Sequence, residues 1–397
     1  MFTNQSQLLS KVHQSLTDLS ETHLIIKENT ENWEKNQNVI LGVDAASVNP
    51  AVTIFNDQSI KGLVNNYESK DKFFTQGSVT LQLFEEWLKN NSKLMVNSMF
   101  LFNVQPLNPN LNSFIIHIHP SNCGKGEKLI IQILNNLKDQ LKKFDINTVA
   151  FAADGDSVFR PMHVQNIKDH IINNILYTSI SSSQTLIISD PLHLLKRARY
   201  HLVPDIFDTN QFISLLNLPS MTMRKDRASK MHDRLPLLLF QMQNYEILSQ
   251  NNLFNYSLFI LPFSLLLSGL SYEVSYENRV LLFHLSRRLF HFIYFSPNNF
   301  FYKDQIKYKP QILSDSLSTL ISICDIFNQN FDQEIHLNRC GTNPIEHNFG
   351  IIRMRSRDHH KADRFIKEAA KINAIRRLRE EMIMDSIIHL SPFPKLK

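Results

Sequence analysis

The order of apolar runs along the chain limits its fold more strongly than any other feature of the sequence. Short continuous or alternating apolar runs indicate buried strands, and apolar positions three or four residues apart indicate helices. The strand-like runs are 39–44, 98–104, 114–119, 148–154 and 185–189, and the helical patterns are 125–143, 162–177 and 191–202. Three strands come first, and the later strands alternate with helices. This order predicts an α/β fold with an RNase H-like mixed sheet flanked by helices.

The segments outside these runs predict the remaining architecture. The run 51–55 is expected to pair with the first strand across the turn-like residues 47–50, and the mostly polar residues 57–92 form an insertion. From 204 to 335 strand signals vanish and apolar helical patterns dominate, which predicts a large all-helical insertion. We therefore divide the chain into an N-terminal helical segment (1–37), the first part of the core (38–203), the helical insertion (204–335) and C-terminal helices that complete the core (336–397).

Composition excludes several classes of protein. The chain has 397 residues, 43% of them hydrophobic, which is enough for a sizeable buried core. Its three cysteines form no C-x-x-C pair, so neither a disulfide scaffold nor a cysteine-rich zinc site is expected. The most hydrophobic stretch, Leu253–Leu267, contains Pro262 and is shorter than the ~20 residues of a membrane span, so it predicts a buried helix pair. We expect a soluble intracellular protein without membrane contact.

Acidic residues stand where three of the strand-like runs end. Asp44 ends the first run, Asp154 and Asp156 flank a glycine at the end of the fourth, and Asp190 follows the fifth, just before Pro191. A carboxylate beside a hydrophobic run is costly unless it is paired or bound to a metal ion. Ordinary explanations compete: a strand-end turn, an Asp-Gly-Asp loop and a helix N-cap. Of the two acids around the glycine we favour Asp154, because it terminates the strand.

A fourth acid and two groups of basic residues complete the candidate site. Glu346 lies early in a helical pattern that begins at 343, where the helix dipole also favours an acid. His193 falls in the first turn of the predicted helix 191–202, at the sheet edge where α/β folds collect ligands. Basic residues follow both positions: Lys196, Arg197 and Arg199 after His193, and Arg353, Arg355 and Arg357 after Glu346. With a net charge of +5, these residues would suit a phosphate backbone, although they are equally typical of solvated helix faces.

The residue types predict a particular chemistry. An acid at the end of the first strand, another at the end of a middle strand and a third early in a late helix is the arrangement of an RNase H-like active site. Phosphodiester cleavage with two metal ions needs several carboxylates that converge on one point. Mg²⁺, or Mn²⁺ in its place, suits such a site because it keeps water and phosphate oxygens among its ligands.

Together these motifs resemble the eukaryotic cut-and-paste DNA transposases of the DDE type, the P-element-like and related superfamilies. The resemblance rests on Asp44, the Asp-Gly at 154–155, the block DPLHLLKRAR at 190–199 and the block NPIEHNFGIIR at 343–353. It spans about residues 38–380. It implies metal-dependent cleavage and transfer of DNA strands at transposon ends, in the nucleus, by a homo-oligomer.

The resemblance also implies roles for individual residues. Asp44, Asp154 and Glu346 would be the catalytic acids and hold two Mg²⁺ or Mn²⁺ ions, with Asp156 and Asp190 as alternatives for the middle ligand. Asp190 and His193 would support the site. The first 38 residues contain no cysteine and only two histidines, too few for the zinc-binding DNA-binding domain that such transposases carry. A plain RNase H-like nuclease and a catalytically silent DNA-binding derivative therefore remain as alternatives.

Overall fold

The computed structural model describes a defined set of residues of the chain. These are 16–48, 53–54, 60–61, 89, 95–108, 110–121, 127–154, 159–172, 175–176, 186–206, 209–226, 232–271, 273–295, 310–329, 345, 347–349, 351–352 and 362–383.

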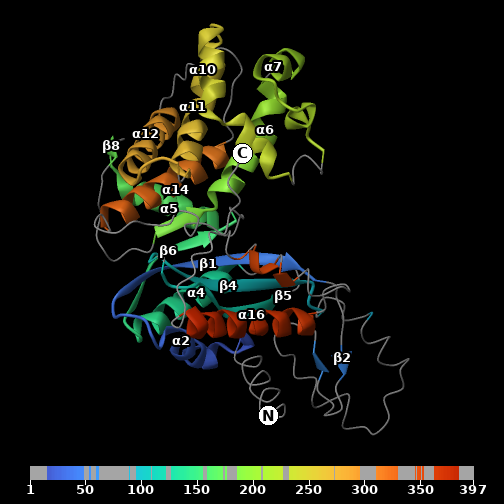
Figure 1. The fold of residues 1–397 in the computed structure, drawn as a ribbon, viewed down its shortest axis with the longest axis vertical. Helices are drawn as coiled ribbons and strands as arrows, with labels where there is room; N and C mark the ends of the chain where they lie inside the picture. The colour runs from blue at the N-terminus through green and yellow to red at the C-terminus, as the bar shows by residue number, and fades with distance from the viewer. Residues whose placement is uncertain are drawn as a thin grey trace.

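A five-stranded mixed sheet forms the centre of the molecule (Figure 1). Its strands are β1 (Gln37–Ser47), β4 (Ser98–Pro106), β5 (Phe114–Ser121), β6 (Ile146–Ala153) and β9 (Leu186–Ser189), and their order across the sheet is β5-β4-β1-β6-β9. β4 is antiparallel to both β1 and β5, whereas β6 runs parallel to both β1 and β9. All five predicted strands are present, and the predicted RNase H-like mixed sheet is confirmed.

Two buried apolar clusters hold the helices to this sheet. One cluster includes residues of α2 (Thr22–Thr30), α4 (Glu127–Lys142) and α16 (Ala362–Ile383), and the other includes residues of α5 (Arg160–His170), α6 (Pro191–Ile206) and α14 (Pro310–Gln329). β9 alternates between them, with Ile187 in the first cluster and Leu186 and Ile188 in the second. This alternation follows from the two-residue period of a strand and explains why the run contains no polar face.

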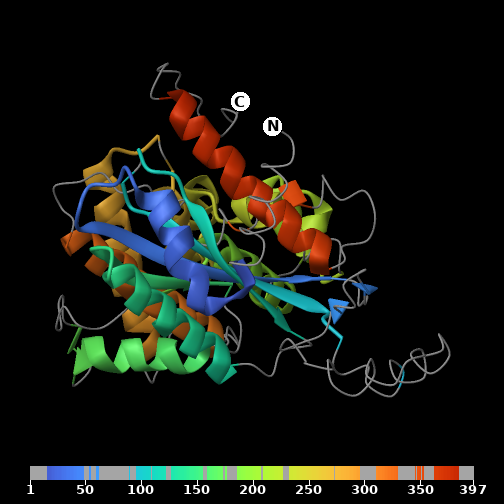
Figure 2. The same ribbon diagram turned by 90° about the horizontal axis from the view of Figure 1, so that it is seen from below.

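The helix α16 covers the outer edge of the sheet. The side-chain amide of Asn373 accepts a hydrogen bond from the Ile115 backbone N–H (2.9 Å) and donates one to the Ile115 carbonyl (2.6 Å). An edge strand otherwise presents unpaired backbone groups, so this contact both anchors α16 and protects β5. Figure 2 shows α16, in red, as a long helix on the outside of the sheet.

The predicted all-helical insertion is present. Its elements are α7 (Thr209–Leu216), the 3-10 helix η6 (Ser220–Met223), α9 (Arg234–Leu239), α10 (Met242–Gln250), α11 (Phe254–Gly269), α12 (Tyr276–Phe295) and α14, and the described part of 209–329 contains no strand. The stretch predicted to be a helix pair is instead the single helix α11, which tolerates Pro262 in its interior. Among the described helices, none is both long and apolar enough to cross a membrane.

Two local predictions were wrong. The strand expected at 51–55 forms β2 (Thr53–Ile54), which pairs with β3 (Ile60–Lys61) and not with β1, whose neighbours are β4 and β6. The helix expected over 162–177 ends at His170 and is followed by β7 (Ile171–Ile172) and β8 (Ile175–Leu176), an antiparallel pair. The β-branched residues after His170 favour a strand, and the two asparagines between the short strands are typical turn residues.

A buried polar layer joins β9 to α5 and α14; we call it the β9 seam. His163 of α5 bonds to Ser189 Oγ through Nε2 and to Ser318 Oγ through Nδ1, both at 2.9 Å. The Ser189 backbone N–H donates to Thr319 Oγ1 at 2.9 Å. Because Ser189 is the last residue of β9, the seam fixes the strand end that precedes Asp190.

Candidate active site

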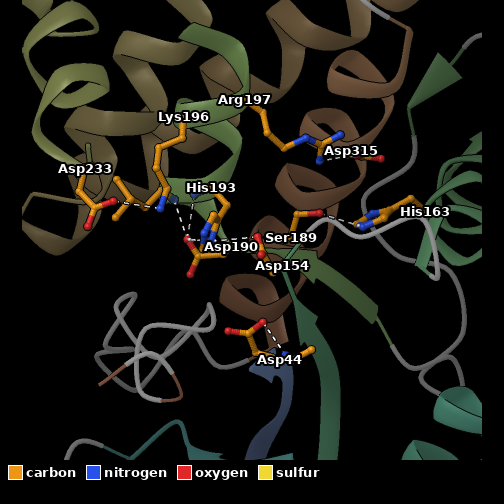
Figure 3. A network of polar contacts seen from close by, with 12 residues as sticks. Asp44, Asp154, His163, Ser189, Asp190, His193, Lys196, Arg197, Asp233 and Asp315 are labelled. Carbon is orange, nitrogen blue, oxygen red and sulfur yellow. Dashed lines mark hydrogen bonds and ion pairs between the residues drawn. The ribbon is translucent and has the colours of Figure 1, made fainter. Parts of the chain in front are cut away.

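Three of the predicted acids stand side by side at the carboxyl edge of the parallel strands. In the sheet register Val43 lies opposite Ala153, and Ala153 lies opposite Ser189. The residues that come next in the chain are Asp44, Asp154 and Asp190. Neighbouring strands are about 4.8 Å apart, so each of these acids lies close to the next one along the sheet edge. Figure 3 shows Asp44 on β1 just below the other two acids.

The sequence analysis predicted that Asp44 ends its strand, but in the structure the strand continues beyond it. β1 continues to Ser47 because its pairing with β4 extends to Ser47 opposite Ser98, whereas its pairing with β6 stops at Val43. Asp44 is therefore still paired with β4 on one side of β1, whereas on the other side the pairing with β6 has already ended. Its Oδ1 accepts a hydrogen bond from the Ala45 backbone N–H (2.7 Å), and the side chain is partly exposed.

Asp190 caps the helix α6. Its Oδ1 accepts hydrogen bonds from the backbone N–H groups of Leu192 (2.9 Å) and His193 (3.1 Å), and the residue is only 1% exposed. This is the N-cap arrangement expected from the Asp-Pro sequence. One oxygen of Asp190 is thus committed to the helix, which leaves Asp154 as the better placed of the two for a ligand.

His193 links these two carboxylates. Its Nδ1 lies 3.1 Å from Asp154 Oδ1 and 3.6 Å from Asp190 Oδ1 (Figure 3). Burial disfavours a charged imidazole, but the nearby carboxylates of Asp190 and Asp154 outweigh it and raise the pKa of His193 to about 9. At neutral pH the side chain is therefore a cation beside Asp154.

Asp154 remains open to solvent on one side. Its side chain is 40% exposed, and burial of the rest, with the neighbouring Asp190, raises its pKa although His193 opposes this. Two carboxylates this close favour a bound cation, because like charges raise the cost of ionising both. Within the described residues no group of three or more His, Cys, Asp or Glu is placed to hold a metal ion.

Ile345 lies against β1 at Gly42, two residues before Asp44. A Cβ atom at Gly42 would lie 2.9 Å from Ile345 Cδ1 and would also overlap the amide of Gln105, so a glycine is needed for this close approach. Ile345 is fully buried, and the next residue in the chain is Glu346. The remaining predicted site residues lie outside the described part of the chain: Asp156, Glu346, Arg353, Arg355 and Arg357.

The basic residues of α6 contact groups of the helical insertion. Lys196 Nζ pairs with Asp233 Oδ1 (2.9 Å), and Arg197 Nη1 pairs with Asp315 Oδ2 (2.8 Å). Arg199 is fully buried and donates from Nη1 to the carbonyl of Thr222 (2.7 Å). Phosphate binding by Lys196, Arg197 and Arg199 stays a prediction, and in this structure the Arg199 side chain is buried and bonded within the protein.

The sequence analysis missed the acidic partners on the insertion, Asp233 and Asp315. A signal for the second was present, because α14 carries polar residues at helical spacing within an apolar helix. These residues are Asp315, Ser318, Thr319, Ser322 and Asp325, all of them buried. Such a stripe predicts contact with polar groups of another element.

The sheet order, the parallel strands with aligned acids and the helical insertion together define an RNase H-like α/β protein. Among solved structures, the fold is similar to that titled "Drosophila P element transposase strand transfer complex", with a TM-score of 0.59 and 12% sequence identity over 86% of this chain and 78% of that chain. At this identity the similarity concerns the fold, which is transposase-like. No protein-family model and no curated protein sequence matches the chain.

Proposed function

We propose that this protein is a metal-dependent DNA-cleaving and strand-transferring enzyme of the DDE transposase type. The observation that carries the proposal is that Asp44, Asp154 and Asp190 each follow the last residue in register on three adjacent parallel strands. Asp190 caps α6, but strand packing gives no reason for the acids at the same level beside it, Asp44 and Asp154. A site for cations that bind phosphate oxygens does.

Asp44, Asp154 and Glu346 are the proposed ligands for two Mg²⁺ or Mn²⁺ ions. Ile345 lies against Gly42 on the strand that carries Asp44, which supports Glu346 as the third acid. Such ions supply Lewis-acid chemistry: activation of water or a 3′-hydroxyl and stabilisation of the leaving oxygen. Carboxylates with open positions for water and phosphate suit these hard ions.

The other residues of the site position these ligands. Asp190 fixes the first turn of α6 through two backbone hydrogen bonds, and this turn presents His193. His193 contacts Asp154 Oδ1 and so restrains the carboxylate while leaving its second oxygen available. The positive charge of His193 also offsets part of the repulsion between Asp154 and Asp190.

DNA is the proposed partner, in the nucleus. The support is the similarity of the fold to the P element transposase strand transfer complex and the basic residues after Glu346. Binding through phosphate contacts weakens steeply as salt rises, so the logarithm of the affinity should fall linearly with the logarithm of salt concentration. A protein that binds in this way but cleaves in no divalent metal would be the catalytically silent derivative.

The experiment is a cleavage and joining assay with labelled DNA that carries candidate transposon ends, in Mg²⁺ or Mn²⁺. Asp44→Asn, Asp154→Asn and Glu346→Gln should each reduce cleavage at least ~100-fold, more than the ~10–100-fold typical of residues that act through a ligand. His193→Asn should fall in that smaller range and raise the Mg²⁺ concentration needed for half-maximal cleavage. Joined products distinguish a transposase from a plain nuclease, which leaves only hydrolysed ends.

The matched control is Asp139→Asn, which removes an exposed acid of α4. It should cleave like the unaltered protein, and all variants should keep its circular dichroism spectrum and melting temperature. Full cleavage by Asp44→Asn or Asp154→Asn would contradict the proposed site.

A further inference from the structure

The described residues on either side of Glu346 belong to a short segment that is buried against α16. These described residues of the range 345–352 are helical, and we call them the Ile345 segment. Ile345 and Phe349 are buried in the same apolar cluster as residues of α16, and the ring centroid of Phe349 lies 5.8 Å from that of Phe365 on α16. Apolar burial is non-directional, so it holds the segment in place without fixing its exact position.

A buried polar side chain gives the Ile345 segment a directional contact. Asn348 is fully buried, and its Oδ1 accepts a hydrogen bond from Arg376 Nη2 of α16 at 2.6 Å. Within the described part of the chain, the Nδ2 atom of Asn348 has no hydrogen-bond partner. A buried amide that makes no hydrogen bond is costly, so the bond from Arg376 stabilises the segment in this one position.

The same guanidinium also bonds to the sheet. Arg376 Nη1 donates to the carbonyl of Ser113, the residue directly before β5, at 2.9 Å. One turn earlier on α16, Asn373 makes its two hydrogen bonds with the backbone of Ile115, so α16 is fixed on β5 (Figure 1). A guanidinium is planar and its donors form a rigid fork. One side chain therefore sets the distance between the start of β5 and Asn348.

The Ile345 segment is thus held at two points that enclose Glu346 in the sequence. On one side of Glu346, Ile345 lies against Gly42, two residues before Asp44 on β1. On the other side, Asn348 is bonded to Arg376. A shift at either point would move the chain on both sides of Glu346 relative to β1.

From these contacts we infer that Arg376 is a positioning residue for Glu346. It holds the Ile345 segment through Asn348 at a fixed distance from the sheet, so that Glu346 is presented to the edge where Asp44 lies. The role of Glu346 rests on the proposed function, whereas the contact between Arg376 and Asn348 can be tested without catalysis.

Hydrogen–deuterium exchange of the full chain, followed by mass spectrometry, is the test that needs no catalysis. Arg376→Met removes both hydrogen bonds and leaves the Asn348 amide buried without a partner, so the amides of 345–352 should exchange at least ~10-fold faster. Lys371→Met is the matched control, because it removes a cation of the same helix that is 47% exposed and pairs with Glu368 at 2.8 Å. It should leave the exchange of 345–352 unchanged.

A second substitution distinguishes this role from a contact of Arg376 with DNA phosphate. Asn348→Leu removes the buried amide, so the double variant Asn348→Leu/Arg376→Met should exchange at 345–352 within ~3-fold of the unaltered protein. Ser113 is half-buried, and water can replace the bond that its carbonyl loses. DNA cleavage in Mg²⁺ should follow the same order, with a ~10–100-fold loss in Arg376→Met and recovery in the double variant.

Two results would overturn the inference and leave the proposed function intact. One is unchanged exchange at 345–352 in Arg376→Met. The other is a double variant that regains slow exchange but cleaves as poorly as Arg376→Met, because the guanidinium would then act on DNA. If the unaltered protein cleaves no DNA, the proposed function fails, and the exchange measurements still decide whether Arg376 holds the Ile345 segment.

Discussion

Acid should destabilise this protein through His163, the histidine at the centre of the β9 seam. Burial, and to a smaller degree the charge of Arg197, lowers its pKa from the ordinary 6.5 to about 3. The folded chain therefore keeps His163 neutral where the unfolded chain binds a proton. Stability contributed by the neutral form is complete above pH 6.5 and is lost as the pH falls toward 3.

The magnitude follows from the two pKa values. Between pH 7.5 and pH 5.0 the difference in proton binding at one such histidine removes about 2 kcal/mol from the free energy of unfolding. His163 is 1% exposed, so solvent screening reduces this little. A loss of this size is a large fraction of the stability of a typical domain.

Urea denaturation at the two pH values measures the effect, with His163→Gln as the comparison. The variant lacks the titrating ring, so it should lose about 2 kcal/mol less than the unaltered protein between pH 7.5 and 5.0. His117, whose pKa burial also lowers to about 3, is present in both proteins and cancels in the comparison. Equal losses in the two proteins, or a His163 resonance that titrates near pH 6.5 in the folded state, would refute the reasoning.

Three substitutions elsewhere should have distinguishable effects. Gly42→Ala inserts a methyl group against Ile345 and should cost about 1–3 kcal/mol by urea denaturation, with a loss of DNA cleavage; unchanged stability would argue against this packing. Asp190→Ala removes the cap of α6 and should lower the free energy of unfolding by about 1–2 kcal/mol. Asp233→Ala removes a partly exposed ion pair with Lys196 and should lower the free energy of unfolding by less than ~1 kcal/mol. Asp325→Ala breaks the buried 2.6 Å contact with His170 and should cost about 3–5 kcal/mol; a cost below that of Asp233→Ala would contradict this.

The main strands and the order of the fold could be predicted from the sequence because buried strands and amphipathic helices leave strong local patterns. The run before Asp44 and the run before Asp190 are apolar because both faces of these strands are covered. The N-cap role of Asp190 was predictable for the same reason, since the Asp-Pro pair is a local signal. Pairing partners are not local, and β2 shows this, because it pairs with β3 and not with β1.

The environment of α6 could not be predicted. Lys196, Arg197 and Arg199 look like a basic helix face, because sequence alone does not reveal what packs on that helix. In the structure two of the three pair with acids far along the chain, Asp233 and Asp315, and Arg199 is fully buried. The register of Asp44 and Asp154, 110 residues apart, is also a property of the sheet and not of either strand. Whether Asp44, Asp154 and Glu346 act as catalytic ligands stays a prediction.

These contacts give the helical insertion a structural role at the site. α6 contacts Asp154 through His193, and it contacts α14 through the ion pair between Arg197 and Asp315. α14 in turn bonds to the end of β9 through Thr319 and, by way of Ser318 and His163, to Ser189. The strand end before Asp190 and the helix after it are therefore both held by the insertion. Removal of the insertion would leave the Ser189 backbone N–H and His163 Nδ1 without their partners on α14, so the strand end before Asp190 should lose its alignment in a chain reduced to its sheet.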